Sequence, residues 1–302
     1  MRAVACAALL LAALFAAGCG NNTLAACADC AADAAGTPAD APVSTPDAPA
    51  AACGSGCGSN EACCGDVCKP LGTLTDCSAC GDTCGSGDFC DGAQCEAPTY
   101  PNFCANNTVY EIDDGIASDI NAAALMGSTI TANCPASITL TTENQTDAAL
   151  IDQTTGEPLG GSSVTYVLAG GPFAQLAVKW LEQTAAVTSV YFAQPDSTTY
   201  AWMQRGDATP VASMPAASCT DHYDQFVVEL VTDPGNGTLS LVGYGVCQGG
   251  RGTFGAAYYY ANVMLPNAMQ YPDSWYVFSW TDTNNDGVAG SGDTFTVLAH
   301  GM

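Results

Sequence analysis

The amino-acid sequence predicts a mainly β protein, in which a disordered tether and a small disulfide-rich loop module precede a C-terminal antiparallel β-sandwich. Three observations predict this fold class. Ten of the 18 Cys lie between residues 53 and 95, and the segment before them has hardly a large apolar side chain. The rest of the chain alternates short β-branched or aromatic runs with Gly, Pro, Asn and Asp. We therefore expect four parts: a signal (1–18), a tether (19–52), a module (53–98) and a sandwich (99–302).

The amino terminus predicts export. Arg2 precedes an apolar run from residue 3 to residue 17, which is too short to cross about 30 Å of hydrocarbon and indicates a removable signal. Its end, Phe15-Ala16-Ala17-Gly18-Cys19, resembles the lipobox of bacterial lipoproteins. The resemblance implies acylation of Cys19, and Gly20 implies sorting to the outer membrane or cell surface. The alternative is an ordinary signal peptide, with Cys19 as the first Cys of the mature chain.

The charge balance limits the partners. Asp and Glu number 30 against 5 Lys and Arg, which gives a formal net charge of −25. A nucleic-acid binder is excluded, because contact with a polyphosphate backbone requires clustered cations. Anionic head groups repel the chain as well, so we expect attachment to the membrane through the lipid alone.

The tether follows from composition. Residues 20–52 are rich in Ala, Pro and Asp and cannot bury enough surface to offset the entropy of ordering. They contain Cys27 and Cys30, whose spacing also occurs in redox pairs. A redox pair needs a strand that leads into a helix, so we expect a local disulfide.

The number of Cys in the mature chain indicates an oxidising compartment. Loss of Cys6 with the signal and acylation of Cys19 leave an even number, which predicts eight disulfides. The predicted half-cystines are Cys27, Cys30, Cys53, Cys57, Cys63, Cys64, Cys68, Cys77, Cys80, Cys84, Cys90, Cys95, Cys104, Cys134, Cys219 and Cys247.

The module from Cys53 to Cys95 is too small to fold around an ordinary core, so cross-links must hold it. Adjacent Cys63 and Cys64 are expected to bond to two different partners. The runs Cys63-Cys64-Gly65-Asp66-Val67-Cys68 and Asp76-Cys77-Ser78-Ala79-Cys80-Gly81-Asp82-Thr83-Cys84, followed by Cys90 and Cys95, resemble the Cys-rich repeat of the plant stigma-specific protein family. The resemblance implies a rigid extracellular module with no catalytic residues. Zinc at Cys77, Cys80 and Cys84 is the alternative.

The C-terminal domain shows strand-like runs separated by turn residues. They cover residues 163–168, 173–182, 187–193, 199–204, 225–232, 238–246, 256–264, 274–281 and 294–299. The clearest hairpin joins residues 226–231 to residues 239–242 through Asp233-Pro234-Gly235-Asn236-Gly237. Residues 117–126 are expected to form one short helix, and Cys104, Cys134, Cys219 and Cys247 are available as two staples.

One loop has the register of a calcium site. Counting from Asp282, positions 1, 3 and 5 carry side-chain oxygens, Gly287 stands at position 6 and a carboxylate returns at position 12. Strand-like flanks make it similar to the Asp-x-Asn-x-Asp-Gly loops of bacterial surface proteins. The predicted ligands of a structural Ca²⁺ are Asp282, Asn284, Asp286, the Val288 carbonyl and Asp293. The alternative is an acidic hairpin loop without an ion.

Catalytic patterns are weak. Ser218, Asp221, His222 and Asp224 lie close in sequence, but no nucleophile elbow surrounds any Ser. Asp113 and Asp114 point to opposite faces if they lie on a strand. The late aromatic residues, Tyr258-Tyr259-Tyr260, Tyr271, Trp275, Tyr276 and Trp280, are expected to pack in the core and less readily to stack on sugars.

These observations predict a lipid-anchored surface protein that binds a glycan or protein ligand, or mediates adhesion, without catalysis. Two alternatives stay open. A secreted hydrolase that acts on an envelope or extracellular polymer requires His222 or a carboxylate pair in a deep pocket. A purely structural envelope spacer requires neither a groove nor a ligand.

Overall fold

The structure is a computed structural model. It describes residue 53 and residues 56–59, 61–73, 75–85, 88–90, 94–96, 99–100, 108–133, 138–247 and 249–302. The predicted signal, the tether and the half-cystines Cys27, Cys30, Cys104 and Cys134 lie outside the described residues, as does the lipidation site Cys19. Within these ranges, no helix combines the length and the apolar character needed to cross a bilayer. The chain divides after Ala48, and every described residue belongs to the second unit, so the boundary near residue 98 stays a prediction.

Disulfides hold the module, as predicted. Its two small antiparallel sheets pair β1 (Glu61–Cys64) with β2 (Val67–Pro70) and β3 (Phe89–Cys90) with β4 (Cys95–Glu96). Its ten Cys form five bonds: Cys53–Cys63, Cys57–Cys68, Cys64–Cys80, Cys77–Cys90 and Cys84–Cys95. Cys63 and Cys64 therefore have different partners. Cys77, Cys80 and Cys84 each belong to a separate disulfide, which leaves no thiolate for zinc.

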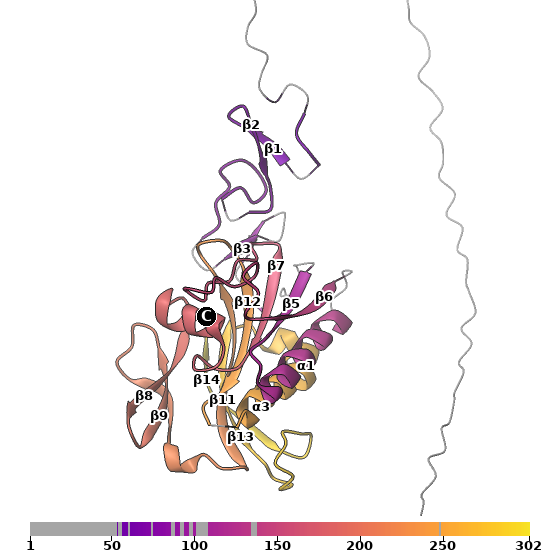
Figure 1. Cartoon of the computed structure of the whole chain (residues 1–302). Coiled ribbons are helices and arrows are strands. Elements are labelled where there is room, and N and C mark those ends of the chain that lie inside the picture. The colour runs from indigo at the N-terminus through magenta and orange to yellow at the C-terminus, as the bar shows by residue number, and fades with distance from the viewer. Residues whose placement is uncertain are drawn as a thin grey trace, which may run out of the picture. The chain divides into compact units, whose positions relative to one another are not determined.

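The rest of the described chain is mainly β, and its sheets pack in a sandwich-like arrangement (Figure 1). A seven-stranded sheet consists, from edge to edge, of β14 (Thr294–Gly301), β13 (Trp275–Thr281), β11 (Tyr223–Thr232), β12 (Leu239–Gly245), β7 (Val164–Ala169), β5 (Thr108–Asp113) and β6 (Thr139–Asn144). A three-stranded sheet consists of β10 (Pro210–Pro215), β9 (Thr199–Gln204) and β8 (Val190–Asp196).

The large sheet is mixed, which differs from the antiparallel pairing predicted for it. β14, β13, β11 and β12 are antiparallel to one another, and the predicted β11–β12 hairpin is confirmed in register Thr232↔Leu239. The pairs β12–β7, β7–β5 and β5–β6 are parallel. Parallel strands need a long crossover. Here α1 (Ala117–Asn133) supplies it between β5 and β6, and it continues beyond the helix predicted over 117–126.

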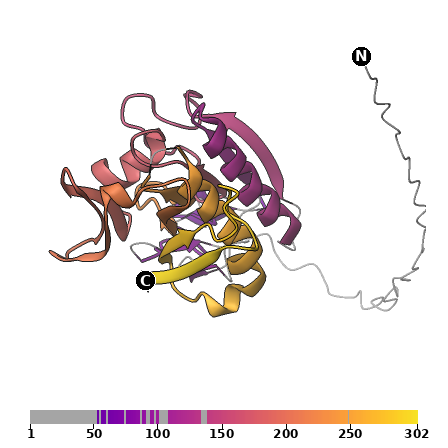
Figure 2. The ribbon, with the colours of Figure 1, turned by 90° about the horizontal axis from the view of Figure 1, so that it is seen from below.

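The large sheet is covered on both faces. α1 lies beside α3 (Arg251–Tyr259) on one face, and β8 and β9 lie on the other (Figures 1 and 2). Alternation along β11 explains this arrangement, because Phe226, Val228 and Leu230 belong to the core under the helices. Val227 and Val231, which alternate with them and point to the other face, belong to the core shared with the small sheet.

Two predicted strands are helical. Residues 173–182 contain α2 (Leu176–Lys179), and the π-helix η2 (Trp180–Thr184) follows it directly. Residues 256–264 belong to α3 and to the π-helix η4 (Tyr260–Met264), and the 3₁₀-helix η5 (Leu265–Gln270) follows. In the second segment the buried residues recur at helical spacing: Ala256, Ala257, Tyr260, Ala261 and Met264. The helical spacing of these buried residues, three of which are Ala, outweighs the high strand propensity of the aromatic run.

Candidate functional site: a groove at the strand ends

The carboxyl ends of three parallel strands meet at one edge of the large sheet. β5, β7 and β12 run in the same direction, so the loops that follow them lie together. Two of these loops lead into α1 and α3. Ligands of sheets with parallel strands commonly bind outside such strand ends, because the connecting loops form a crevice there. In this protein the edge carries two adjoining cavities.

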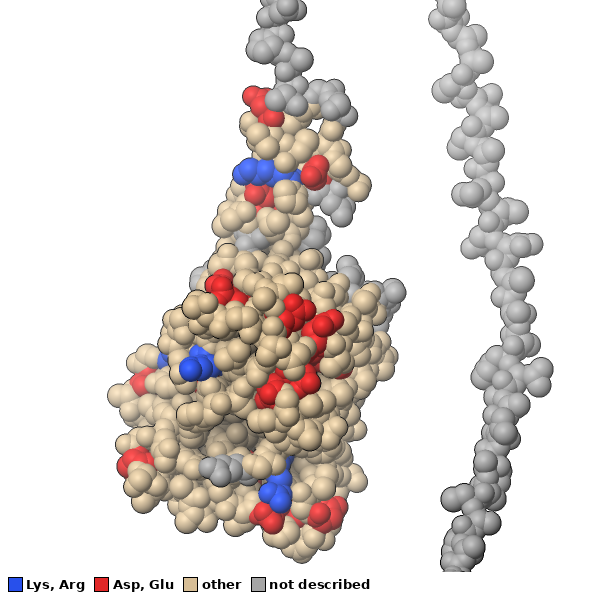
Figure 3. Space-filling view, in the orientation of Figure 1, with Lys and Arg blue, Asp and Glu red and all other residues tan. Residues whose placement is uncertain are grey.

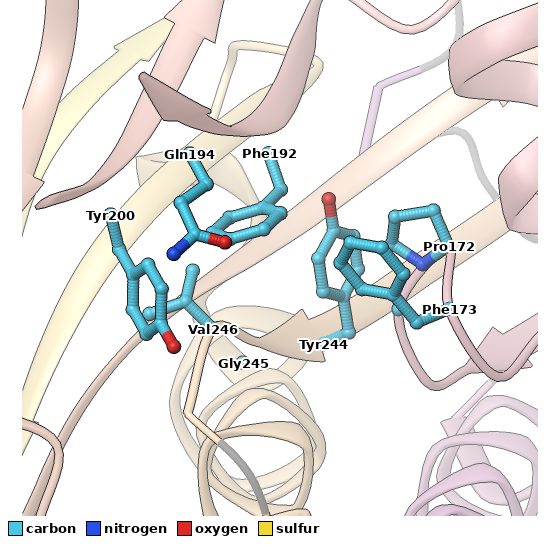
Figure 4. Close-up of a pocket in the computed structure, with 9 residues that line it drawn as sticks. Pro172, Phe173, Phe192, Gln194, Tyr200, Tyr244, Gly245 and Val246 are labelled. Carbon is cyan, nitrogen blue, oxygen red and sulfur yellow. The ribbon is translucent and has the colours of Figure 1, made fainter. Parts of the chain in front are cut away.

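The first cavity, called here the aromatic pocket, has a volume of about 270 Å³. Its lining residues are Gly171, Pro172, Phe173, Phe192, Gln194, Tyr200, Tyr244, Gly245 and Val246. Figure 4 shows Phe192 and Tyr200 on one side of the pocket and Tyr244 and Phe173 on the other. Gly171 permits this arrangement, because a β-carbon there would lie 2.9 Å from the Tyr244 ring. The two sheets and the loop after β7 therefore build the pocket together.

The second cavity, called here the strand-end groove, has a volume of about 660 Å³. It shares Gly171, Phe173, Gly245 and Val246 with the aromatic pocket and is lined further by Ile116, Ala117, Ser118, Asp119, Ala174, Cys247, Gly249, Gly250 and Thr253. Phe173 lies between the two cavities and is 85% exposed. The disulfide Cys219–Cys247 ties the loop after β12 to the end of β10 and η3 (Ala216–Ser218). The groove thus has one wall that is covalently fixed.

A carboxyl pair adjoins this groove. Oδ2 of Asp119 and Oδ2 of Asp114 lie 2.7 and 2.8 Å from the position that a β-carbon on Gly170 would take. Burial raises the pKa of Asp114 to about 6, and repulsion from Asp119 adds to this rise. Burial also raises the pKa of Asp119, although Ser118 Oγ donates a hydrogen bond of 3.0 Å to its Oδ1. The pair retains a proton closer to neutral pH than two separate carboxyls do.

A buried carboxylate supports the other wall. Asp224 is fully buried, and its Oδ1 accepts hydrogen bonds from the backbone N–H groups of Gln225, at 2.7 Å, and Cys247, at 3.0 Å. Burial raises the pKa of Asp224 to about 7. A β-carbon on Gly252 would lie 2.1 Å from Asp224 Oδ2, so the first turn of α3 approaches this carboxylate because residue 252 is Gly.

Replacement of Gly252 by Ala is expected to lower the free energy of unfolding by about 3 kcal/mol, because it overpacks this contact. Urea denaturation followed by circular dichroism measures the change. Gly290→Ala is the matched control, since the nearest atom to its β-carbon is 3.8 Å away. Equal stability of the two variants would contradict the proposed role of Gly252.

The candidate residues for nucleophilic catalysis contact different partners in the structure. His222 Nδ1 lies 2.6 Å from Asp282 Oδ2, and the His222 side chain is 48% exposed. Asp221 forms an ion pair of 3.0 Å with Arg251, and Asp224 lies beneath the start of α3. None of the four candidates, which include Ser218, is among the described lining residues of either cavity.

The carboxyl pair in the structure is not the one considered from sequence. Asp114 approaches Asp119 in α1, whereas the sequence suggested Asp113 and Asp114. The spacing Asp114 to Asp119 across the start of a helix is the signal that could have revealed it. The predicted core role of the late aromatic residues is confirmed for Tyr260, Trp275, Tyr276 and Trp280, which are buried.

The predicted calcium loop bonds largely to itself. Asp282 accepts hydrogen bonds from the N–H groups of Asn285 and Gly287 at 2.6 and 2.7 Å. Asn284 Nδ2 donates to Asp286 at 2.9 Å, and Oδ2 of Asp293 accepts bonds of 2.9 Å from Trp280 and from Gly290. Val288, the predicted carbonyl ligand, donates its own N–H to Asp286 Oδ1 at 2.9 Å.

The three carboxylates of the loop are not grouped closely enough to share a metal. Among the described residues, three-residue groups close enough to share a metal contain half-cystines, and the loop carboxylates form no such group. The donor set is chemically suitable for Ca²⁺ because it consists of oxygens. The loop is also closed by its own hydrogen bonds, so the calcium loop and the hairpin loop without an ion both stay predictions.

Comparison of the chain with protein-family models, with curated proteins and with solved structures found no significant match.

Proposed function

We propose that this chain is an exported, lipid-anchored surface protein whose C-terminal domain binds an extracellular glycan or protein ligand in the two adjoining cavities without catalysis. The anchor is supported by the lipobox-like end of the signal and by the even number of Cys that remain. The module and tether would then act as a spacer between membrane and ligand.

The exposed side chain of Phe173 is the main observation that supports ligand binding in these cavities. A large apolar side chain that is 85% exposed between two cavities gains little from folding, whereas a ligand that covers it would remove apolar surface from water. Phe173 belongs to the loop after β7, at the edge where ligands of such sheets commonly bind. Among the described lining residues of the aromatic pocket, none is a His, Cys, Lys or acid that could act as nucleophile or base.

A binding screen with two variants tests the proposal. The full chain, extracted in detergent, is applied to immobilised glycans and extracellular proteins. Phe173→Ala is expected to weaken binding at least tenfold, because about 1.4 kcal/mol corresponds to tenfold and an aromatic contact supplies that much. Met269→Ala is the matched control, since Met269 is 84% exposed and lines neither cavity. Failure to bind any ligand, or equal binding by both variants, would overturn the proposal.

The predicted export and lipid anchor have their own test. Intact mass of the native protein is expected to show loss of residues 1–18, acyl chains on Cys19 and two hydrogen masses fewer per disulfide. An unprocessed initiator Met would contradict export.

A structural Ca²⁺ in the loop from Asp282 to Asp293 remains part of the proposal, supported by the spacing of its oxygen donors. Millimolar Ca²⁺ is expected to raise the free energy of unfolding by about 1 kcal/mol, as for a site with a dissociation constant of about 10⁻⁴ to 10⁻³ M. Thermal denaturation with Ca²⁺ or a chelator measures the change, and Asp286→Ala should abolish it. Asp207→Ala, an exposed carboxyl elsewhere, is the control. A stabilisation that survives Asp286→Ala, or no stabilisation, would favour the loop without an ion.

The Asp114–Asp119 pair favours a secreted hydrolase as the second candidate, because two close carboxyls that share a proton can act as acid and base. Turnover of a polysaccharide or peptide panel that Asp119→Asn abolishes would establish it. Binding without turnover would remove it.

A further inference from the structure

We infer that the aromatic pocket is a cage for a quaternary alkylammonium group. This inference rests on the proposed function and names the part of the ligand that the pocket would hold.

The arrangement of the rings is the first observation. The ring centroids of Phe173 and Phe192 are 6.0 Å apart and their planes are inclined at 77°. Phe192 and Tyr200 are 5.5 Å apart and inclined at 71°. Rings that are nearly perpendicular to their neighbours form the walls of a box and do not make a flat platform. Phe192 therefore has a nearly perpendicular ring on two sides, and the three aromatic side chains all line the same pocket. Ring faces attract a cation that lies within about 6 Å of their centroid.

The polar groups of the pocket are the second observation. Sugars are held through several hydrogen bonds, but the side-chain polar groups among the described lining residues are Gln194, Tyr200 and Tyr244. The Tyr244 hydroxyl already donates to Glu182 beneath the pocket. In Figure 4 the Gln194 amide lies between Tyr200 and Phe192, where its oxygen could face a cation. A group that needs few hydrogen bonds fits this lining better than a sugar ring.

The charge distribution is the third observation. The chain carries a formal charge of −25, and acidic side chains gather on the face shown in Figure 3, whereas Lys and Arg are scattered. Asp119 lines the adjoining strand-end groove. Lys179 lines an adjoining hollow that shares Pro172 and Phe173 with the aromatic pocket, but it does not line the aromatic pocket itself. The negative net charge of the chain therefore favours the approach of a cation over that of an anion.

Isothermal titration calorimetry of the full chain tests the cage with choline and with its neutral carbon isostere, 3,3-dimethyl-1-butanol. Choline is expected to bind at least fivefold more tightly, because only the cation interacts with the ring quadrupoles. Phe173→Leu and Tyr200→Leu should each remove most of this preference, since they retain apolar volume but lose a ring. Phe173 is largely exposed, so Phe173→Leu keeps the fold, and Met269→Leu is the matched control.

Two further probes distinguish the sources of the group. Tighter binding of phosphocholine than of choline indicates a head group and supports the cage, whereas tighter binding of Nα-acetyl-lysine amide than of choline indicates a primary ammonium on a protein partner and overturns it. Equal binding of choline and its isostere, or no binding of choline, overturns it. The binding screen separates this failure from failure of the proposed function: a screened ligand lost in Phe173→Ala would leave that function standing.

Discussion

Raising the pH from 5 to 8 is expected to lower the free energy of unfolding of this protein by about 7 kcal/mol through two buried carboxyl groups. These two groups lie between the two sheets, and Asp224 and Asp114, whose pKa values are raised by burial to about 7 and about 6, add to the loss in the same direction. Burial raises the pKa of Glu182 to about 8 and, chiefly through the same effect, the pKa of Glu229 to about 8. Repulsion from Glu182 adds to the shift of Glu229.

The sign follows from proton binding. In the unfolded chain both groups release their protons near their ordinary pKa of 4.5, whereas the folded protein retains them up to about pH 8. Their contribution to stability is therefore fully present below pH 4.5 and is lost as the pH rises to 8. The Tyr244 hydroxyl and Arg205 lower the pKa of Glu182, but burial dominates. Carboxyls with lowered pKa, such as Asp282, titrate below this window.

Urea denaturation at pH 5, 6, 7 and 8 measures this dependence. Glu229→Gln, which keeps the shape of the side chain but cannot ionise, is expected to flatten the pH dependence and to be more stable than the natural chain at pH 8. Glu143→Gln, on the edge strand β6, is the control and should leave the slope unchanged. A stability that is constant from pH 5 to pH 8, or that rises, would contradict the burial of an acid pair.

Complete reduction of the disulfides is expected to unfold the module. In the described part of residues 53–96, the buried apolar residues are Cys77 and Cys90, which are themselves half-cystines. Two-stranded sheets as short as β1–β2 and β3–β4 are not stable alone in water. Each disulfide contributes about 2–5 kcal/mol, so five of them replace a core.

Hydrogen–deuterium exchange before and after reduction measures this effect. Amides of β1 and β2 should lose their protection, whereas those of β11 and β13, in the centre of the large sheet, should retain it. The Cys219–Cys247 bond provides the internal control, because the domain around it has two extensive apolar cores. Protected β1 and β2 amides in the reduced protein would show that something other than sulfur holds the module.

Much of the fold could be predicted from the sequence. Alternation of apolar residues located β9, β11, β12 and β13, and the Pro-Gly-Asn-Gly turn located the hairpin that joins β11 to β12. Two of the missed strands are weakly apolar: β6 is an edge strand without a fully buried residue, and β10 begins and ends with Pro. The parallel half of the sheet could not be derived, because local patterns do not encode which strands become neighbours.

The site was harder to predict than the fold. The sequence predicts a strand over residues 173–182, in which Phe173 would alternate with buried neighbours, but Phe173 lies in a turn and is exposed. Tyr200, Phe192 and Tyr244 come from two sheets that meet only through tertiary packing. Prediction of the Asp114–Asp119 pair would have required knowledge that the first turn of α1 packs against the end of β7. The two motifs that stand out in the sequence, around His222 and from Asp282 onward, do not line the cavities but contact each other through His222 and Asp282.

Hydrogen–deuterium exchange of the full chain with a ligand from the screen tests the central claim most directly. If the strand ends form the binding site, bound ligand will slow exchange in the loop after β7, in β8 and β9 beside Tyr200, and in the loop between β12 and α3. Protection confined to β14 or to the loop between Asp282 and Asp293, with those three segments unchanged, would place the binding surface elsewhere and contradict the account.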